Sequence, residues 1–407
     1  MNEQHSSKGS LLFIFLTIFV DVMGIAIIIP VIPDLLETLT GKSLNEAGLI
    51  GGLLIASFAI MQFLFAPLIG ELSDKYGRRP VLFIALAGLG IDYIFHALAP
   101  SLILLFIGRM LAGICGGSHT VATAYIADVS TPENKAKNFG MIGAAFGLGF
   151  FLGPMIGGIC AQWGYQMPFF VAAGLTLVNL IFGMLVLPES LPKDKRRDIE
   201  WKRAIPGLNL IHLKRYHSLL LFVAAFVLVQ LAGQVMPSIW TFFTMEQYGW
   251  GPGLVGLSLG VVGLLVGLVQ AGLIGWSVKK FGQKKVILAG FFFWTTGMLL
   301  FACAYKEVLL FVALIPYVMG GIAGPTIQSM MSNTVKDNEQ GNLQGALTSM
   351  ISLTSIIGPL IYTSLFSFFA DKASQVYFPG APFLAGAFFL IIASLIAIKA
   401  ISQLEDS

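Results

Sequence analysis

Apolar residues run along this chain in long blocks separated by short polar stretches, rather than in strict alternation with polar ones. A helix that crosses the hydrocarbon core of a bilayer needs about 20 consecutive, mainly apolar residues. Twelve blocks approach or exceed that length. They cover residues 11–33, 48–70, 80–98, 101–123, 138–160, 166–187, 218–240, 252–277, 286–304, 308–332, 342–366 and 381–403. The pattern predicts an all-α membrane protein with twelve transmembrane helices.

The longest polar stretch, residues 188–217, divides the twelve blocks into six and six. We therefore expect an N-terminal six-helix bundle at 1–187, a cytoplasmic linker at 188–217 and a C-terminal six-helix bundle at 218–407. The linker carries charges of both signs. It can act as a gating or regulatory segment, or as a passive tether held by its positive charge. The sequence leaves both interpretations open.

The two halves repeat the same motifs at a constant spacing. GELSDKYGRRPV begins at Gly70 and GWSVKKFGQKKV at Gly275. GMIGAAFGLGFFLGPMIG begins at Gly140 and GALTSMISLTSIIGPLIY at Gly345. Both pairs are offset by 205 residues without a gap. Because each half has six helices, both halves cross the membrane in the same orientation. This predicts two pseudo-symmetric bundles with a substrate site near the midplane between them.

Composition and charge strengthen the membrane assignment. The chain is 56% hydrophobic and 11% charged, with a mean hydropathy of +0.84, whereas soluble domains carry about 25% charged residues. With the N-terminus inside, twenty Lys and Arg fall in inner loops and tails and three in outer loops. Positive charge marks the cytoplasmic side. We expect a multi-pass protein of the cell inner membrane with both termini cytoplasmic, and no nucleic-acid partner.

Three charged side chains lie near the middle of apolar blocks, all in the first half: Asp21, Asp92 and Arg109. Charge in hydrocarbon is costly and usually functional. A carboxylate in an apolar, intermittently hydrated cavity can load and release a proton. We expect Asp21 to couple transport to protons, with Arg109 holding its charged form or orienting Asp92. The alternative is a static Asp92–Arg109 pair that locks the helices together.

Uncharged polar and aromatic side chains mark the candidate substrate site. Amides at midplane depth need partners, which a central cavity supplies, and aromatic walls with a few polar groups suit a moderately apolar ligand. Each can instead bond to a neighbouring helix. His96 and His119 can relay protons or serve in packing. The candidate substrate-binding residues are Gln62, His119, Gln230, Gln234, Trp240, Gln270, Trp294 and Gln328.

The segment GELSDKYGRRP resembles the loop between the second and third helices of major facilitator transporters. In that superfamily the loop acts as a cytoplasmic latch on the outward-facing state, so the resemblance implies a gating role. The second copy has Lys279 in place of Asp74, and we expect a weaker latch there. The gating residues expected in this region are Gly70, Asp74, Gly77, Arg78, Arg79 and Asp128.

The fifth block contains GAAFGLGFFLGPMIGG, from Gly143 to Gly158. It is similar to the signature of drug–proton antiporters within the superfamily. The resemblance implies gating at Gly153, Pro154 and Gly157, since proline bends a helix. Tight helix packing is the simpler interpretation of so many glycines, and both can hold together.

More narrowly, the chain resembles the tetracycline-resistance efflux pumps. The similar stretches are DVMGIAIIIPVIPDLL from Asp21, GRMLAGICGG from Gly108 and NEQGNLQGALTS from Asn338. Those pumps carry a histidine in the eighth helix and an acid in the ninth that matter for transport. An alignment anchored on Gln270 places Val266 and Trp294 at these positions. The resemblance therefore does not by itself identify tetracycline as the substrate.

Together these features predict a proton-coupled secondary antiporter that exports a small amphiphilic or drug-like compound by alternating access. A proton-coupled importer or facilitator of a nutrient on the same fold is the alternative, because fold does not fix direction. The sequence contains no G-x-x-x-x-G-K-S/T loop of the kind that binds ATP phosphates, so we do not expect ATP to be the energy source. We expect no cofactor, no bound metal, no enzymatic activity and a monomer whose partners are the substrate, protons and the lipid bilayer.

Overall fold

The structure is a computed structural model that describes residues 2–130, 135–201, 204–206, 217–334, 340–372 and 376–405. Every regular element in these ranges is a helix, and twelve spans among them are long and apolar enough to cross a membrane. The predicted all-α fold with twelve transmembrane helices is confirmed. Residues 202–203 and 207–216 of the predicted linker lie outside the described residues.

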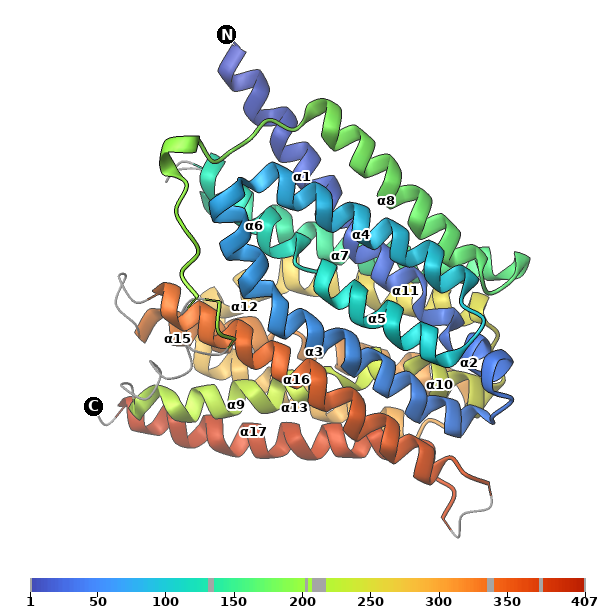
Figure 1. The fold of residues 1–407 in the computed structure, drawn as a ribbon. Helices are drawn as coiled ribbons and strands as arrows, with labels where there is room; N and C mark the ends of the chain where they lie inside the picture. The colour runs from blue at the N-terminus through green and yellow to red at the C-terminus, as the bar shows by residue number, and fades with distance from the viewer. Residues whose placement is uncertain are drawn as a thin grey trace. The chain divides into compact units, whose positions relative to one another are not determined.

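The first six spans are built from the following helices, in chain order (Figure 1). They are α1 (Asn2–Ile27), η1 (Ile29–Val31), α2 (Ile32–Thr40), α3 (Leu44–Tyr76), α4 (Arg78–Leu98), α5 (Leu102–Cys115), α6 (Ser118–Val129), α7 (Lys135–Cys160), η2 (Ala161–Trp163) and α8 (Met167–Val186). The short η3 (Lys193–Lys195) follows the sixth span. The helix α1 packs along α7, and α4 packs along α8.

The last six spans follow the same plan. They are α9 (His217–Gly233), α10 (Val235–Tyr248), α11 (Pro252–Leu268), η5 (Val269–Leu273), α12 (Ile274–Phe281), α13 (Gln283–Ala302), α14 (Glu307–Gly320), α15 (Ala323–Thr334), α16 (Gln340–Phe369) and α17 (Ala381–Glu405). The turn η5 is π-helical and continues α11 into α12. Turns of this kind inside α-helices are frequent at functional sites.

Several observed spans are longer than the apolar blocks that predicted them. The first extends to Thr40 rather than 33, and the second covers Leu44–Tyr76 rather than 48–70. In the first, Pro33 lies within the opening turn of α2, where a missing N–H costs no helical hydrogen bond. In the second, the polar residues around Asp74 remain helical. Hydrophobicity marks the hydrocarbon thickness, not the ends of a helix.

The repeat inferred from the motifs is also present in the backbone. Gly77 and Gly282, which are 205 positions apart, precede α4 and α13 with positive φ values of 102° and 81° and ψ values of 155° and 156°. A side chain is rarely tolerated at such φ values. Gly116 and Gly321, separated by the same interval, end α5 and α14 at equivalent breaks. The two halves are therefore structural repeats.

The chain forms two compact units. The first comprises Met1–Gly41, Ser57–Pro206 and Gly251–Gly263, and the second Lys42–Ala56, Gly207–Trp250 and Leu264–Ser407. The division falls inside α3 and α11, so each of these helices contributes to both units.

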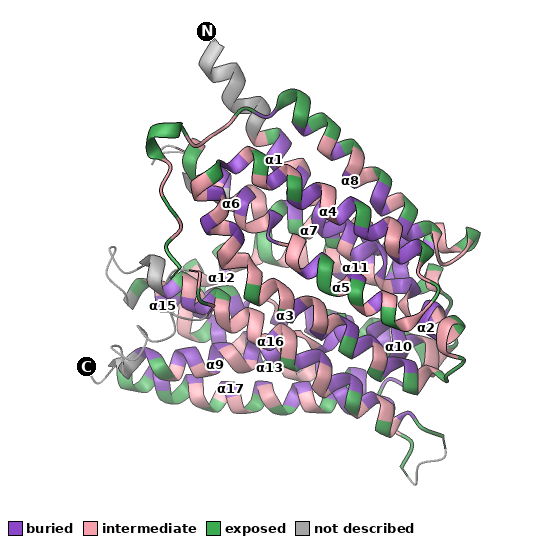
Figure 2. Cartoon of the chain, in the orientation of Figure 1, coloured by how far each residue is buried: buried purple, intermediate pink, exposed green. Residues whose placement is uncertain are grey.

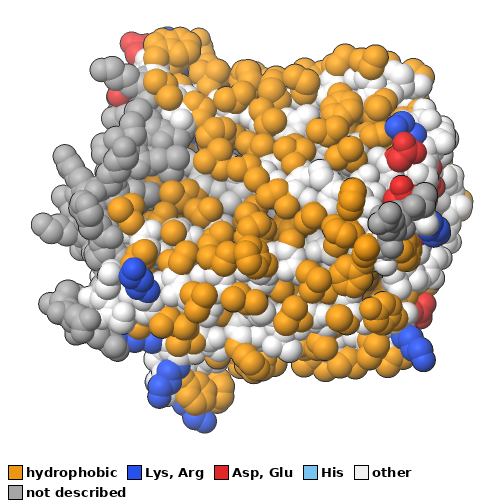
Figure 3. All heavy atoms as spheres, turned by 90° about the horizontal axis from the view of Figure 1, so that it is seen from below, with side chains coloured by type: hydrophobic (Ala, Val, Ile, Leu, Met, Phe, Trp, Pro, Cys, Tyr) orange, Lys and Arg blue, Asp and Glu red, His pale blue; other side chains and the backbone are white. Residues whose placement is uncertain are grey.

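Each unit has an apolar interior and an apolar exterior. Phe13, Leu82 and Tyr125 are fully buried in the first unit, and Phe301 and Phe383 in the second. Large hydrophobic side chains are nevertheless exposed, up to 80% for Leu185. Figure 2 shows exposed positions recurring along α8, which carries Leu185. Figure 3 shows one face covered mainly by hydrophobic side chains, with Lys, Arg, Asp and Glu toward its two ends. Such a surface suits hydrocarbon rather than water.

Candidate functional site

A buried carboxylate lies in the interior of the first unit. Asp21 of α1 is only 8% exposed. The hydroxyl of Ser118 donates a hydrogen bond of 2.6 Å to Oδ2 of Asp21. Its other oxygen, Oδ1, is buried and has no hydrogen-bond partner among the described residues. One oxygen is thus stabilised in its charged form while the other remains available to a proton or a water molecule.

A helix break positions the hydroxyl that binds Asp21. Ser118 is the first residue of α6, directly after the break at Gly116 and Gly117. A Cβ atom at Gly117 would lie 2.6 Å from the side chain of Ile69 on α3. The absence of a side chain therefore lets the break approach α3 closely. Sequence reasoning missed Ser118, although its place after a Gly-Gly pair inside an apolar block was a usable signal.

A second acidic side chain pairs with histidine rather than arginine. Asp92 and His96 lie one turn apart on α4 and are 5% and 2% exposed. Nδ1 of His96 is 3.0 Å from both the carbonyl oxygen and Oδ1 of Asp92, and its hydrogen bond goes to the carbonyl. The ring of His96 stacks on Phe169 of α8 at 5.8 Å. Oδ1 of Asp92 and Nε2 of His96 have no hydrogen-bond partner in the described part of the chain.

Glycine on α5 allows this pair to fit. A Cβ atom at Gly108 would lie 2.6 Å from Cε1 of His96 and 3.1 Å from Oδ1 of Asp92. Arg109 follows on the same helix and lies within electrostatic range of Asp92. The ion pairs of the described residues do not, however, include one between Arg109 and Asp92. The fixed Asp92–Arg109 pair, left open by the sequence, is therefore not formed. The four-residue spacing of Asp92 and His96 could have revealed the pair that does form.

A tyrosine connects the two acidic centres. Tyr93 is 3% exposed and lies within electrostatic range of Asp21, Asp92 and Arg109. Its hydroxyl oxygen would be 2.5 Å from a Cβ atom at Gly24, three residues after Asp21. The first unit therefore gathers its intramembrane charges around one aromatic hydroxyl. Sequence reasoning did not single out Tyr93.

The expected gating loop forms a network of ion pairs within the first unit. Asp74 contacts the guanidinium groups of Arg78 and Arg197. Nε of Arg78 lies 3.0 Å from Oδ2 of Asp128, and Nη1 of Arg78 donates to the hydroxyl of Ser73 at 2.6 Å. The structure thus joins Asp74, Arg78 and Asp128. Nη2 of Arg79 instead donates to the carbonyl of Met184 at 2.9 Å.

The segment after α8 docks on this loop. Glu189 accepts hydrogen bonds from the backbone N–H groups of Arg78 at 2.8 Å and Arg79 at 3.3 Å. It therefore caps the N-terminus of α4, where negative charge is favoured. A side chain at Gly77 would collide with the Glu189 carboxylate. No motif in the sequence indicated that Glu189 has this role.

Arg197 makes the second contact of the docked segment. Its Nε donates to Oδ2 of Asp74 at 2.9 Å, and its Nη2 to Oε1 of Glu71 at 2.8 Å. The backbone N–H of Glu200 donates to Oε2 of Glu71 at 3.0 Å. Burial alone would lower the pKa of Arg197, but the hydrogen bond and charge of Asp74, with Glu71 and Glu200, raise it. Residues 189–200 are thus bound to the loop rather than free.

The glycine-rich face of α7 is an interface with α1. Cβ atoms at Gly149 and Gly153 would lie 2.8 Å from Cγ1 of Val22 and 2.7 Å from Cβ of Ala26. At Gly157 a Cβ atom would collide with the carbonyl oxygen of Ile27. Tight packing is therefore a property of this face, while gating at Gly153, Pro154 and Gly157 stays a prediction.

The same helix also meets α11 through small residues. A Cβ atom at Gly256 would collide with the carbonyl oxygen of Pro154, and one at Gly260 would lie 2.5 Å from Cγ of Met155. The helix α7 is held on two sides by contacts that leave no room for side chains. Gly143 and Gly147, nearer its start, have nothing within 4 Å.

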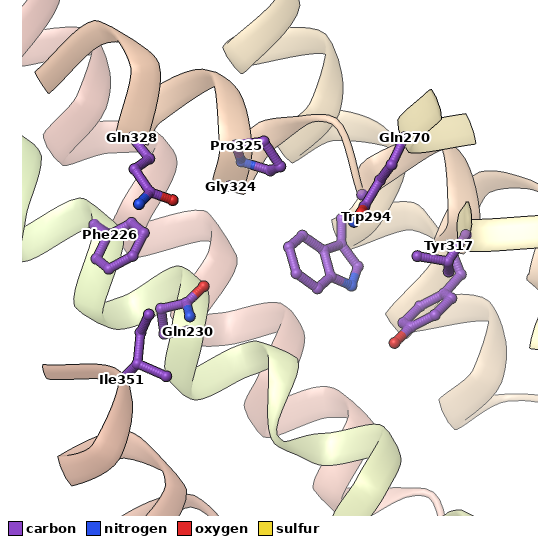
Figure 4. A pocket seen from close by; sticks show the side chains of 11 residues that line it. Phe226, Gln230, Gln270, Trp294, Tyr317, Gly324, Pro325, Gln328 and Ile351 are labelled. Atoms are coloured by element: carbon purple, nitrogen blue, oxygen red, sulfur yellow. The ribbon is translucent and has the colours of Figure 1, made fainter. Parts of the chain in front are cut away.

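A cavity of about 250 Å³ lies within the second unit. Four of the predicted substrate-binding residues line it, namely Gln230, Gln270, Trp294 and Gln328, together with Val266. Figure 4 shows the indole of Trp294 in the middle of the lining, with Phe226 and Gln230 on one side and Gln270 and Tyr317 on the other. No charged side chain is among the lining residues.

The remaining predicted substrate-binding residues lie elsewhere. Trp240 is only 1% exposed and packs edge-on against Phe301 at 5.4 Å, so its assignment to a binding surface is corrected to core packing. Nε2 of Gln234 donates to the hydroxyl of Ser355 at 3.0 Å, which is the inter-helix alternative. Sequence hydrophobicity could not separate Trp240 from Trp294, because both occupy apolar helices.

Two candidates belong to the first unit. Nε2 of Gln62 donates to the carbonyl of Gly116 at 3.3 Å, which supports the helix break before Ser118. The ring of His119 packs edge-on against Phe146 at 5.1 Å, and its Nδ1 is buried with no hydrogen-bond partner in the described ranges. Neither lines the cavity of the second unit.

Comparison with known proteins gives consistent results. A family model described as Major Facilitator Superfamily matches residues 14–273 and 234–405. Tetracycline resistance protein, class C, from Escherichia coli is 38% identical over 381 residues, which is 94% of each chain. Multidrug resistance protein 2 from Bacillus subtilis (strain 168) is 26% identical over 407 residues, covering 96% of this chain and 94% of that protein.

A solved structure resembles the fold over nearly the full chain. It is a bacterial homologue of the human lysosomal transporter Spinster, with a TM-score of 0.79 at 16% sequence identity and 97% coverage of both chains. At this identity the likeness concerns the fold alone. The resemblance to resistance proteins that the sequence predicted is therefore supported by the sequence relatives, not by this solved structure.

Proposed function

Because the chain belongs to the major facilitator superfamily, we propose that it is a proton-coupled antiporter that exports a small amphiphilic or drug-like compound by alternating access. The observation that carries the proposal is Asp21, a buried carboxylate with one oxygen bonded to Ser118 and one without a partner. Relatives named for resistance to tetracycline or to several drugs support export. The alternative, import of a nutrient, is not favoured by these relatives.

Asp21 would carry the proton. Protonation removes a charge from an apolar interior, and loss of the proton restores a carboxylate that Ser118 stabilises. If the two access states expose Asp21 to opposite sides, uptake on one side and release on the other couple the gradient to the conformational cycle. Exchange against the compound then gives antiport. Asp92 with His96 forms a second polar centre that the same gradient can reach through Tyr93.

The compound would bind where amides and aromatic rings meet in the second unit, at Gln230, Gln270, Trp294 and Gln328. The first unit, which carries the charged side chains, would then bind the proton. The second unit, with its uncharged lining, would bind the compound. A site with no net charge also suits a range of amphiphilic compounds, because it imposes few electrostatic requirements.

The charged loop would act as the gate. Asp74, Arg78 and Asp128 form contacts that a conformational change can break and remake. The packing of α7 on α1 and α11 would transmit the movement, since backbones in such close contact move together. Gly77, where a side chain would collide with Glu189, allows the loop to remain compact. The gating role of Gly70 stays a prediction. Bistable contacts of this type are what switching transitions require.

The location follows from the twelve spans and the charge distribution. The twelve apolar spans make this a multi-pass membrane protein. We place it in the cell inner membrane with both termini cytoplasmic, because positive charge concentrates in the loops on that side. It is proposed to work as a monomer.

Transport in everted membrane vesicles tests the proposal. The vesicle lumen is acidified, and uptake of a probe such as tetracycline or coumarin is followed together with lumen pH. Antiport predicts that the probe accumulates while the lumen pH rises. Asp21→Asn should lose gradient-driven uptake by at least tenfold, because it cannot exchange a proton. Asp34→Asn, which changes an acid on α2, should retain it.

The vesicle experiment can also reject the assignment. Gradient-driven uptake that persists in Asp21→Asn shows that another group carries the proton. Probe loss from an acid lumen, rather than accumulation, indicates transport of the compound and proton in the same direction. That result would favour the importer.

A further inference from the structure

The indole of Trp294 is held in a fixed position at the cavity of the second unit. The backbone of Gly320 on α14 lies against it so closely that a Cβ atom there would collide with the Cβ of Trp294. Tyr317, from the same helix, packs edge-on against the indole at 6.2 Å with an angle of 82° between the rings. The ring therefore depends on helix packing for its orientation, not on a ligand.

The N–H group of this fixed ring has no partner. Nε1 of Trp294 is buried and makes no hydrogen bond to any described residue. An indole N–H can only donate, and a buried donor without an acceptor is unfavourable. Buried tryptophan usually finds a partner for its N–H. A site that keeps this donor unpaired beside a cavity is prepared for a ligand that brings an acceptor.

The other polar groups of the cavity are amides. In the described part of the chain, neither Gln230 nor Gln270 forms a side-chain hydrogen bond, whereas Gln328 donates from Nε2 to Oε1 of Gln344 at 2.9 Å. Gln270 lies in the π-helical turn η5, which shifts the phase of the helix at that position. An amide offers both a donor and an acceptor, so it can satisfy either kind of group on an uncharged ligand.

The lining excludes charge. None of the residues around the cavity is Asp, Glu, Lys, Arg or His, and a charge placed there would lose its hydration without gaining a counter-charge. The volume of about 250 Å³ is below the ~300–1,000 Å³ of drug-sized sites. It suits one or two fused rings, or that part of a larger compound.

We propose that this cavity binds an uncharged, flat ring system with a carbonyl-type acceptor, to which Nε1–H of Trp294 donates a hydrogen bond. Gln230 and Gln270 pair with the remaining polar edge of the ligand. The inference rests on the proposed function, since it names the substrate class of the same site. Permanent cations and anionic metal chelates are poor ligands for this half of the protein.

Three bicyclic probes of similar size test the inference. Coumarin is uncharged and has a carbonyl, naphthalene has no acceptor, and N-methylquinolinium is a permanent cation. Binding is measured by equilibrium dialysis with the full chain in nanodiscs. Coumarin should bind saturably and at least tenfold more tightly than N-methylquinolinium. Trp294→Phe keeps an aromatic wall but removes the donor, and should weaken coumarin binding about 3- to 10-fold without the same effect on naphthalene.

Trp276→Phe is the matched control. Trp276 lies on α12, is 53% exposed and packs against Phe281 and Lys280 rather than the cavity. Coumarin binding should be unchanged in this variant. If Trp294→Phe does not fold, as judged by size-exclusion chromatography, Gln270→Leu replaces it, because Gln270 is exposed on its helix. Its loss should weaken coumarin binding by a similar factor.

Several outcomes overturn the inference. They are no saturable coumarin binding, coumarin affinity unaffected by both cavity substitutions, or N-methylquinolinium bound as tightly as coumarin. Failure of the proposed function gives a different result. In that case pH-driven uptake in vesicles is absent while the order of probe affinities and the effect of Trp294→Phe remain.

Discussion

The two oxygens of Asp21 lie in different surroundings, and this difference determines how the residue can work. A carboxylate whose oxygens were both hydrogen-bonded would stay charged, and one with no donor would stay protonated. Ser118 stabilises one oxygen only. The side chain can therefore exist in either state, and burial and the Ser118 hydroxyl act on it in opposite directions.

Replacing that hydroxyl should shift the pH dependence of transport. In Ser118→Ala the charged form of Asp21 loses its hydrogen bond, so the acid holds its proton to higher pH. A hydrogen bond to a charged group contributes about 1.5–3 kcal/mol, or roughly 1–2 pH units. The pH of half-maximal exchange, measured in vesicles, should move upward by about that amount. Ser130→Ala, which removes a bond to the Ile126 carbonyl and one from Nδ2 of Asn138 but none to Asp21, should leave it in place.

The sequence predicted the residues that carry charge but not their partners. The depth of Asp21, Asp92 and Arg109 in apolar blocks was visible from composition alone. The contact of Asp21 with Ser118 joins positions 97 apart and depends on a helix break, so no local pattern contained it. The His96 contact is local and was accessible from spacing.

The glycines of α7 differ in how closely neighbouring helices approach them. Along α7, the glycines that face α1 sit where any side chain would meet backbone atoms, whereas Gly143 and Gly147 face open space. Tight packing was one of the two interpretations that the sequence left open for this glycine-rich face, and the contacts with α1 agree with it. The sequence could not say which glycines are in contact, because that depends on the neighbouring helices.

Two substitutions on α7 should therefore have opposite effects. Gly157→Ala places a methyl group against the backbone of Ile27, which cannot rotate away. Overpacking of this kind costs about 1–3 kcal/mol. Gly147→Ala has space and should gain up to about 1 kcal/mol from helix propensity. Thermal unfolding in detergent measures both. Equal melting temperatures for the two variants would contradict the assigned interface.

At the scale of the whole molecule, two structurally equivalent halves carry different chemistry. The first has Asp21 and Asp92 buried in its interior and Arg109 half-buried, while the described cavity of the second is lined by amides and aromatic rings. Hydrophobic blocks and the offset of 205 residues were sufficient to predict the helices and their repeat. They could not predict that the compact units divide inside α3 and α11, because composition does not record which neighbours each end of a helix contacts.

The segment that joins the two repeats is bound at its start to the loop between α3 and α4. Arg197 contacts Glu71 and Asp74, and Glu189 caps α4. If Asp74 is part of the gate, then Arg197 competes with any other group that the acid would bind. The docked segment should consequently open before Asp74 can change partners.

Limited proteolysis of the full chain in nanodiscs measures this opening. Trypsin can cut after Lys193, Lys195 and Arg196, and cleavage of a transiently opened segment follows the population of the open form. Arg197→Gln removes the contacts with Glu71 and Asp74 that hold the segment to the loop, and should accelerate cleavage about tenfold. Bonds to charged, partly buried groups are stronger than ordinary surface ion pairs. Asp198→Asn is the control, because Asp198 is 95% exposed and pairs only with Lys75 among the described ion pairs. It should change the rate less than twofold.

Salt at 0.5 M should reduce the difference in cleavage rate between Arg197→Gln and the unmodified protein, because it screens the ion pairs of Arg197. Identical cleavage rates at low salt would show that Arg197 does not hold the segment closed.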